Sequence, residues 1–192
     1  QLTNNYIINT TKNSYENPAH IYPTRIAQQT TGREEVVTRK KYAADYPNLV
    51  SGANDAGIPL LNAKNMKGAE IESYQYRQQT SGQQQRIIDG SVTAYGSDLQ
   101  PVQLFRLESN APLTSYQETD LTASGLTKDA SYKLLGSFSY EGGVLKAQQK
   151  NNDVVTAYIW NSNRSYPTAE IVNSSTPAAA FTSFEEASPT GS

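Results

Sequence analysis

Few residues of this chain have the chemistry for catalysis, and their spacing does not assemble them into a motif. His20 is the single histidine and lies in a loop between Pro18 and Pro23. General-base chemistry would need a nucleophile or carboxylate beside it, and no local spacing of Ser or Asp supplies one. We therefore interpret His20 as an ordinary surface or hydrogen-bonded histidine.

The acidic residues and glycines also point away from a catalytic or cofactor site. Asp residues occur mostly where turns are expected, and there they commonly bond the local backbone. The sequence has no Asp-x-Asp-x-Asp-Gly calcium loop, no glycine-rich phosphate loop and no cysteine. We expect no enzyme activity, no cofactor and no metal site. A glycosidase with two carboxylates far apart in the chain stays open as the lowest-ranked alternative.

The aromatic residues are the remaining candidates for a binding role. The chain has 13 Tyr and one Trp, and an aromatic ring can stack on the apolar C–H side of a sugar. The residues that we single out as candidate carbohydrate or partner contacts are Trp160, Tyr158, Tyr166 and Tyr140. The alternative is that Tyr fills cross-strand pairs on a half-buried sheet, and we favour this structural interpretation.

Composition indicates a sheet with a thin core. Apolar residues make up 36% of the 192 residues and charged residues 18%, so Gln, Asn, Ser and Thr are abundant. A sheet with one buried and one solvated face has such a composition. The net charge of −2 gives no long-range field for nucleic acid, so we predict no nucleic-acid partner. Because there is no apolar run of 18 residues, we expect no membrane-spanning segment.

Runs of β-forming residues around short turns predict the strands. Hairpins are expected over residues 22–42 and 69–95, followed by a strand over 101–107. In the first, Val36, Thr38, Lys40 and Tyr42 would share a partly apolar face, as on an edge or solvent-washed strand. In the second, Ile88, Val92 and Ala94 would share a face. Between the hairpins only a brief helical turn near residues 60–66 is expected, and residues 108–131 form a polar connection.

The strongest prediction is a three-stranded meander near the C-terminal end. Its strands are expected over residues 132–140, 144–150 and 154–160. The residues that we assign to the two tight turns are Gly142, Gly143, Asn151 and Asn152. The predicted class is all-β: successive antiparallel hairpins or a meander forming a β-strip, which could curl into a shell, with no long helix.

Several segments carry a resemblance to one protein family. Residues 138–145, Phe-Ser-Tyr-Glu-Gly-Gly-Val-Leu, look like a YD repeat in which Glu141 replaces the Asp. Residues 156–160, Thr-Ala-Tyr-Ile-Trp, and residues 165–173 with Tyr166-Pro167 resemble a segment of large bacterial RHS-type surface proteins. The resemblance extends more loosely over most of the chain. It implies a β-strip of stacked hairpins that ends near residues 181–185, where such proteins often pass into a further module.

From these features we predict the organisation and role of the chain. Residues 1–21 would be a lead-in strand or loop, 22–173 the YD/RHS-like hairpin region, and 174–192 a Ser/Thr/Ala/Pro-rich linker or boundary. The predicted function is a non-catalytic structural segment that scaffolds or encapsulates other modules, with a carbohydrate- or surface-binding β module as the alternative.

The expected partners are neighbouring repeats of the same polypeptide or an assembly partner, with glycans or export machinery as further candidates. The resemblance implies secretion to the surface of a Gram-negative-type bacterium, for example by type IX secretion. The chain does not open with a signal peptide, so an exported protein would carry that signal elsewhere.

Overall fold

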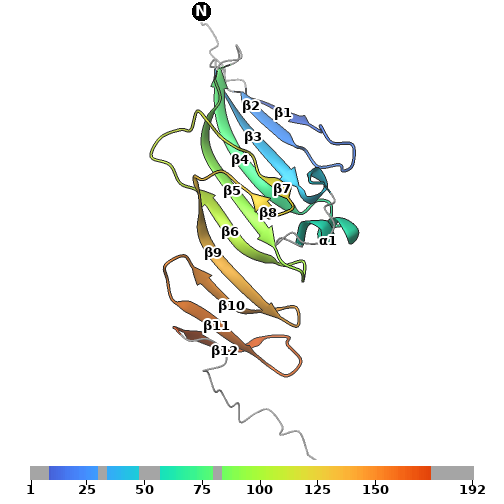
Figure 1. Ribbon diagram of the computed structural model, residues 1–192, viewed down its shortest axis with the longest axis vertical. Coiled ribbons are helices and arrows are strands. Elements are labelled where there is room, and N and C mark those ends of the chain that lie inside the picture. Colours follow the sequence, from blue (N-terminus) through green and yellow to red (C-terminus); the bar gives the residue numbers. More distant parts are fainter. Residues whose placement is uncertain (1–8, 30–33, 48–56, 80–83, 174–192) are drawn as a thin grey trace, which may run out of the picture. The chain divides into compact units, whose positions relative to one another are not determined.

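The computed structural model describes residues 9–29, 34–47, 57–79 and 84–173, which form mostly antiparallel β-sheet (Figure 1). The strands are β1 (Thr10–Ser14), β2 (Arg25–Gln29), β3 (Glu34–Tyr42), β4 (Glu70–Gln79), β5 (Arg86–Tyr95), β6 (Pro101–Leu107), β7 (Asp120–Thr122), β8 (Gly125–Thr127), β9 (Tyr132–Glu141), β10 (Val144–Lys150), β11 (Val155–Trp160) and β12 (Pro167–Val172). The described residues also contain a 3-10 helix, η1 (Ala43–Asp45), and a short α-helix, α1 (Gly57–Ala63). The predicted all-β class is confirmed.

The strand order follows the sequence. Ten strands form one sheet in the order β1-β2-β3-β4-β5-β6-β9-β10-β11-β12, and β7 and β8 pair separately. The chain divides into two compact units, Gln1–Leu134 and Leu135–Ser192, which we describe one at a time. The predicted boundary segment 174–192 lies outside the described residues.

Alternation along the strands places one row of apolar side chains on the same face of the first unit. Val37 of β3 pairs with Tyr76 of β4, and Tyr76 pairs with Ile87 of β5. These three are buried in one cluster with Ala27 and Tyr74. Full burial of each large side chain contributes about 1.5–3 kcal/mol.

The opposite face of β3 carries half-exposed Val36, Thr38 and Lys40, as expected for a solvated face, whereas Tyr42 at the end of the strand is buried. The strand is not at an edge, because β3 pairs with both β2 and β4.

Register shifts interrupt the alternation in several strand pairs. One shift, between Gln75 and Tyr76 in the β4–β5 pair, leaves Ile88 without a directly paired residue. Consequently Ile87, and not Ile88, is buried with Val92 and Ala94. Ile88, which we predicted to share a face with Val92 and Ala94, is only half-buried, because the bulge adds one residue to the period-two pattern. Further shifts follow Lys41, Ala94, Leu145 and Ile159.

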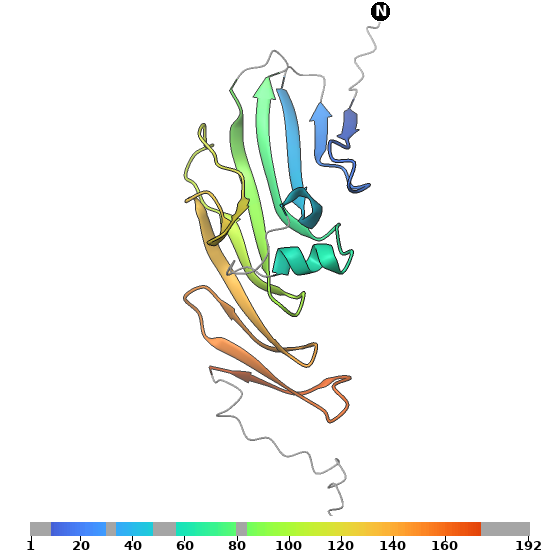
Figure 2. The same cartoon turned by 45° about the vertical axis from the view of Figure 1, so that its right-hand side comes forward.

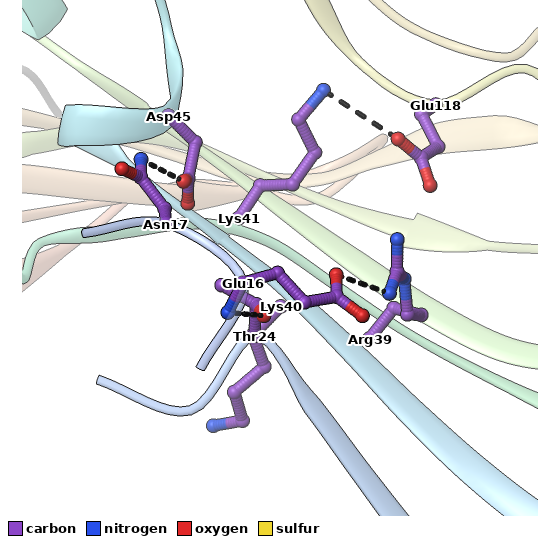
Figure 3. A pocket seen from close by; sticks show the side chains of 8 residues that line it. All are labelled: Glu16, Asn17, Thr24, Arg39, Lys40, Lys41, Asp45 and Glu118. Carbon is purple, nitrogen blue, oxygen red and sulfur yellow. Dashed lines mark hydrogen bonds and ion pairs between the residues drawn. The ribbon is translucent and has the colours of Figure 1, made fainter. Parts of the chain in front are cut away.

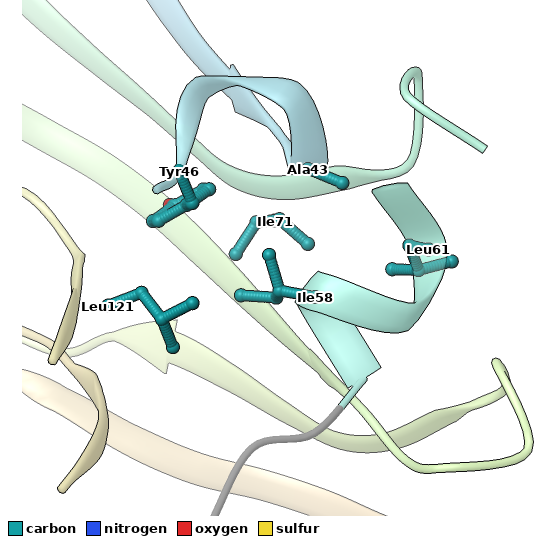
Figure 4. Close-up of a cluster of buried hydrophobic side chains, with 6 residues drawn as sticks. All are labelled: Ala43, Tyr46, Ile58, Leu61, Ile71 and Leu121. Carbon is teal, nitrogen blue, oxygen red and sulfur yellow. The ribbon is translucent and has the colours of Figure 1, made fainter. Parts of the chain in front are cut away.

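A second buried cluster of the first unit lies where α1 and η1 meet the sheet (Figure 4). Ile58 and Leu61 are three residues apart, so they share one face of α1, and both are fully buried. They pack with Ile71 of β4 and with Leu121 of β7. The sequence predicted a brief helical turn at residues 60–66; the helix is present but begins three residues earlier.

The connection between β6 and β9 is more structured than predicted. Residues 108–131, which we name the cover segment, contain the β7–β8 hairpin and place Leu113 and Tyr116 against the cluster around Val37. Figure 1 shows β7 and β8 in front of the sheet strands β4 and β5. The first unit therefore has a second layer over one face of its sheet.

The second unit is a sheet of β9–β12 with no helix among its described residues. The β9–β10 turn contains Gly142 and Gly143, with φ of +59° and +86°, and Asn152 in the next turn has φ of 58°. Both turns thus use left-handed backbone, which Gly and Asn adopt at low cost.

Side-chain placement in this unit follows from the strand register. Phe138 pairs with Gln148, which pairs with Thr156, so alternation places Tyr140, Tyr158 and Trp160 on this same face. We name it the aromatic face. The opposite, aliphatic face carries Ala147, Val155, Ala157, Ile159, Ala169 and Ile171. Between residues 135 and 173 only Gly136, Ala157 and Asn161 are buried.

Candidate functional site

A carboxylate buried under the cover segment is the most unusual polar feature of the described residues. Glu72 of β4 is 0% exposed. Its Oε2 accepts hydrogen bonds from the Thr119 N–H at 2.9 Å and the Thr119 hydroxyl at 2.6 Å. Its Oε1 accepts from the hydroxyls of Tyr116 at 2.5 Å and Tyr132 at 3.3 Å. We name these four residues the Glu72 cluster.

The fold explains why Glu72 points inward. Side chains alternate along β4, so Glu72 lies on the same face as the buried residues Tyr74 and Tyr76. A buried carboxylate needs several hydrogen-bond donors to offset the loss of water. The cover segment supplies Thr119 and Tyr116, and β9 supplies Tyr132.

A glycine in β5 makes room for one of these donors. A Cβ added to Gly90 would lie 2.5 Å from the Tyr132 hydroxyl, closer than side-chain atoms pack. Gly90 is directly paired with Tyr74 of β4. The absence of a side chain at this position lets the Tyr132 ring cross β5 and reach the Glu72 cluster.

Further contacts extend the Glu72 cluster along the sheet. The Tyr74 hydroxyl donates to Glu118 at 2.5 Å. The Lys41 ammonium donates to the Thr119 carbonyl and lies 3.7 Å from the Glu118 carboxylate. The hydroxyls of Tyr46 and Thr119 are also hydrogen-bonded. Tyr74, Lys41 and Tyr46 therefore add to Glu72 and Tyr132 in holding residues 116–119 in place.

The tyrosines of this region keep their protons at neutral pH. Burial raises the pKa of Tyr116, and the Glu72 carboxylate adds to the effect. The pKa of Tyr132 is raised by burial and by Glu72, and that of Tyr74 by burial and by Glu118. Each hydroxyl is thus a stable donor to a carboxylate. Since every carboxylate oxygen of Glu72 is occupied, the cluster has the geometry of an anchor for the cover segment.

A pocket of about 190 Å³ lies beside this cluster in the first unit (Figure 3). It is lined by Glu16, Asn17, Thr24, Arg39, Lys40, Lys41, Asp45 and Glu118. Its charges are paired within the chain: Arg39 with Glu16 at 2.7 Å, Lys41 with Glu118, and Lys40 with Glu70 at 2.7 Å. These pairings join the loop between β1 and β2, strand β3 and the cover segment.

His20 lies in the same region. Its side chain is buried and its Nε2 lies 3.2 Å from Asp45. Its Nδ1 accepts a hydrogen bond from the Tyr22 N–H at 3.1 Å. Both ring nitrogens are thereby used within the fold. His20 is hydrogen-bonded as predicted, although it is not on the surface.

Three of the four predicted contact residues share the aromatic face of the second unit. Tyr140, Tyr158 and Trp160 are half-buried there, and Tyr166 is exposed in the turn between β11 and β12. The Trp160 indole N–H donates to the Leu145 carbonyl at 2.7 Å, and Gln148 donates to the Tyr158 hydroxyl at 2.8 Å. Both rings are therefore held across β10. Burial and the Glu170 carboxylate raise the pKa of Tyr158.

Sequence reasoning did not find the Glu72 cluster. The partners of Glu72 are 44, 47 and 60 residues away in the chain, so no local spacing brings them together. The available signal was the placement of Glu72 two residues before Tyr74, on the face that β4 buries.

Metal-ligand groups, membrane-spanning helices and similarity to known proteins give no further indication of function. No group of three or more His, Cys, Asp or Glu residues among them could hold a metal ion. In the described part of the chain, no helix has the length and apolar character needed to cross a bilayer. Comparison with protein-family models, curated proteins and solved structures finds no match to this chain. The resemblance to RHS/YD-repeat proteins therefore stays a prediction.

Proposed function

We propose that this chain is a non-catalytic structural segment of a secreted or cell-surface protein of the RHS/YD-repeat type, from a Gram-negative-type bacterium. In this proposal the chain scaffolds or encapsulates other modules of the same polypeptide. The observation that carries the proposal is the second unit, whose β9–β12 sheet has two half-exposed faces and no second layer among its described residues.

The aliphatic face is the part of this sheet that most needs a cover. Val155, Ile159 and Ile171 lie on it only partly buried. Burying each against a neighbour would contribute up to about 1.5–3 kcal/mol. A repeat protein meets this need by stacking units that contact their neighbours. We infer that neighbouring repeats, or an assembly partner, cover the aliphatic face.

The interior of the first unit supports a structural role as well. Glu72, the one fully buried carboxylate among the described residues, has its oxygens occupied by Thr119, Tyr116 and Tyr132. The charges around the nearby pocket are paired with one another. These groups hold segments of the chain together, and none of them is left over for a substrate.

The test is the thermal unfolding and association of residues 1–192. We expect a broad transition, or association that increases with concentration, because the described residues of the second unit form a single sheet layer with both faces half-exposed. Ile159→Ser should weaken the association, whereas Val172→Ser, an exposed position on the opposite face, should not. A sharp, concentration-independent, two-state transition of a monomer would contradict the proposal.

A carbohydrate-binding module is the second candidate, and the arrangement of the aromatic face favours it. Tyr158 and Trp160 are fixed across β10 beside Tyr140, which is a geometry for stacking on pyranose rings. Glycan-array screening with Trp160→Ala as the comparison separates the two functions. Binding that disappears in this variant supports a sugar site, and binding that is the same in both proteins rejects it.

A further inference from the structure

The loop between β1 and β2, residues 15–24, reverses the usual placement of polar and apolar side chains. Its polar residues His20 and Thr24 are buried. Its apolar residues face water: Ile21 is 85% exposed, Tyr15 61% and Tyr22 41%. Ile21 is the most exposed large apolar side chain among the described residues. Such an arrangement costs solvation free energy unless the loop meets a partner.

The buried polar side chains fix the conformation of this loop. Asn17 donates to the Asp45 carboxylate at 2.6 Å, and His20 contacts the same oxygen at 3.2 Å. The Glu16 N–H donates to the Thr24 hydroxyl at 3.2 Å. Because its polar groups hold it to η1 and β3, the loop presents Ile21 without having to order on binding.

The connection between α1 and β4 lies against the loop and carries a further exposed apolar side chain, Met66. A Cβ on Gly68 would lie 2.3 Å from the Tyr22 ring, so the ring packs directly on this connection. Met66, two residues earlier, is 44% exposed. Both views show the β1–β2 loop beside this end of α1 (Figures 1 and 2). Tyr15, Ile21, Tyr22 and Met66 form what we name the loop patch.

The charge around the loop patch is positive. Lys64 and Lys67 flank Met66, are exposed, and make no side-chain hydrogen bond or ion pair with any described residue. Of the acidic residues nearby, Glu16 is ion-paired with Arg39 and Glu70 with Lys40. The Asp45 carboxylate is turned toward Asn17 and His20, which hydrogen-bond to it. These two cations, which have no partner among the described residues, therefore flank Met66 of the loop patch.

We propose that the loop patch is a peripheral binding site for an anionic lipid surface. An apolar tip enters the boundary between headgroups and acyl chains, and the adjacent ammonium groups meet anionic headgroups. A free anion would not need Ile21, and an apolar protein groove would not need Lys64 and Lys67. An anionic bilayer can bind both the apolar Ile21 and the two lysines, and it accepts a protruding side chain without a matching cavity. This site is separate from the proposed structural role of the second unit.

Co-sedimentation of the full chain with vesicles tests the proposal. Vesicles of phosphatidylcholine with about 30% phosphatidylserine should bind the chain, and pure phosphatidylcholine should bind it less. Loss of the apolar burial in Ile21→Ser should lower the partition coefficient about tenfold or more. Lys64→Glu with Lys67→Glu should lower it by at least about fivefold per site. Val172→Ser is the matched control, since Val172 is 60% exposed outside the loop patch.

Ile21 and Val172 are both exposed, so circular dichroism should show folded variants in both cases. The proposal is overturned if the wild-type chain does not bind the anionic vesicles. It is also overturned if Ile21→Ser binds as well as the wild type, because binding is then general electrostatic attraction. If Ile21→Ser abolishes self-association in sedimentation velocity without changing vesicle binding, the loop patch is a protein interface instead.

Discussion

Replacement of Glu72 tests whether the Glu72 cluster anchors the cover segment. In Glu72→Leu the Thr119 N–H loses its acceptor, and the hydroxyls of Thr119, Tyr116 and Tyr132 lose theirs. The hydroxyl oxygens of Tyr116 and Tyr132 are 2.7 Å apart and can still share a hydrogen bond. The Thr119 hydroxyl can still bond the Tyr46 hydroxyl. The Thr119 N–H, and at least one hydroxyl proton, would be left buried without a partner. At about 1–3 kcal/mol for each of these two donors, we expect the free energy of unfolding to fall by about 2–6 kcal/mol.

Glu72→Gln separates the effect of charge from that of hydrogen bonding. The amide oxygen can still accept from the Thr119 N–H, and its NH₂ can donate to tyrosine hydroxyls that turn to become acceptors. Only the additional strength of hydrogen bonds to a charged acceptor is lost, so we expect the free energy of unfolding to fall by about 1–2 kcal/mol. The order of stability should be wild type, then Gln, then Leu.

Urea unfolding followed by tyrosine absorbance measures these differences, and hydrogen exchange at the Thr119 amide reports the anchor directly. Exchange at Thr119 should accelerate in Glu72→Leu more than exchange at the Val37 amide in the sheet. If Glu72→Leu were as stable as the wild type, or if Thr119 exchanged at an unchanged rate, the buried carboxylate would not hold the cover segment.

Three further outcomes follow from the same unit. In Gly90→Ala the new methyl group collides with the Tyr132 hydroxyl, so urea unfolding should show a free energy of unfolding lower by about 1–3 kcal/mol. Ser91→Ala is the control and should leave the free energy of unfolding almost unchanged. Burial raises the pKa of Tyr42 to about 12, and burial also raises those of Tyr46, Tyr74, Tyr116 and Tyr132. The protonated hydroxyls stabilise the fold fully below the ordinary tyrosine pKa of about 10, and this stabilisation is lost as pH rises through the higher pKa values of the folded state. Absorbance at 295 nm, which reports ionised tyrosine, should therefore jump when the protein unfolds in alkali. A smooth titration of all 13 Tyr near pH 10 would contradict this expectation. Burial acts to raise the pKa of Asp129, but hydrogen bonds from the backbone of Ser131 and Gln117 outweigh it and lower the pKa. The Asp129 carboxylate stabilises the fold above the ordinary carboxyl pKa, and this stabilisation is lost as pH falls through the lowered pKa of the folded state. Asp129→Asn should therefore show a shallower acid unfolding transition in circular dichroism. An acid transition identical to that of the wild type would show that Asp129 does not contribute to stability.

Local sequence signals predicted the strands well because turns and alternation are short-range properties. The meander over residues 132–160 is present with nearly the expected strand limits, and its turns contain Gly142 and Asn152 with positive φ. The face assignment was less successful wherever a bulge shifted the register, as at Ile88. A bulge depends on how two strands meet, and neither strand alone encodes it.

The candidate site also combines features that local sequence predicts with features that depend on contacts between distant segments. Trp160, Tyr158 and Tyr140 were identified from residue type alone, and strand alternation accounts for their common face once the register is known. The Glu72 cluster could not be predicted, because its donors come from the cover segment and from β9 and meet only after the sheet has formed. The cover segment itself looked like a polar connection, since Thr119 and Tyr116 are polar residues that are used inside the fold.

The repeated register shifts have a consequence for solubility. A long antiparallel meander with regular pairing offers flat strands onto which other copies can add as fibrils. Here five strand pairs are interrupted, after Lys41, Gln75, Ala94, Leu145 and Ile159. Each interruption sharpens the local twist and breaks the even hydrogen-bond ladder that amyloid growth requires. The irregularities that made the side-chain faces hard to predict from the sequence therefore also oppose aggregation of a chain whose described residues lie mostly in β-strands.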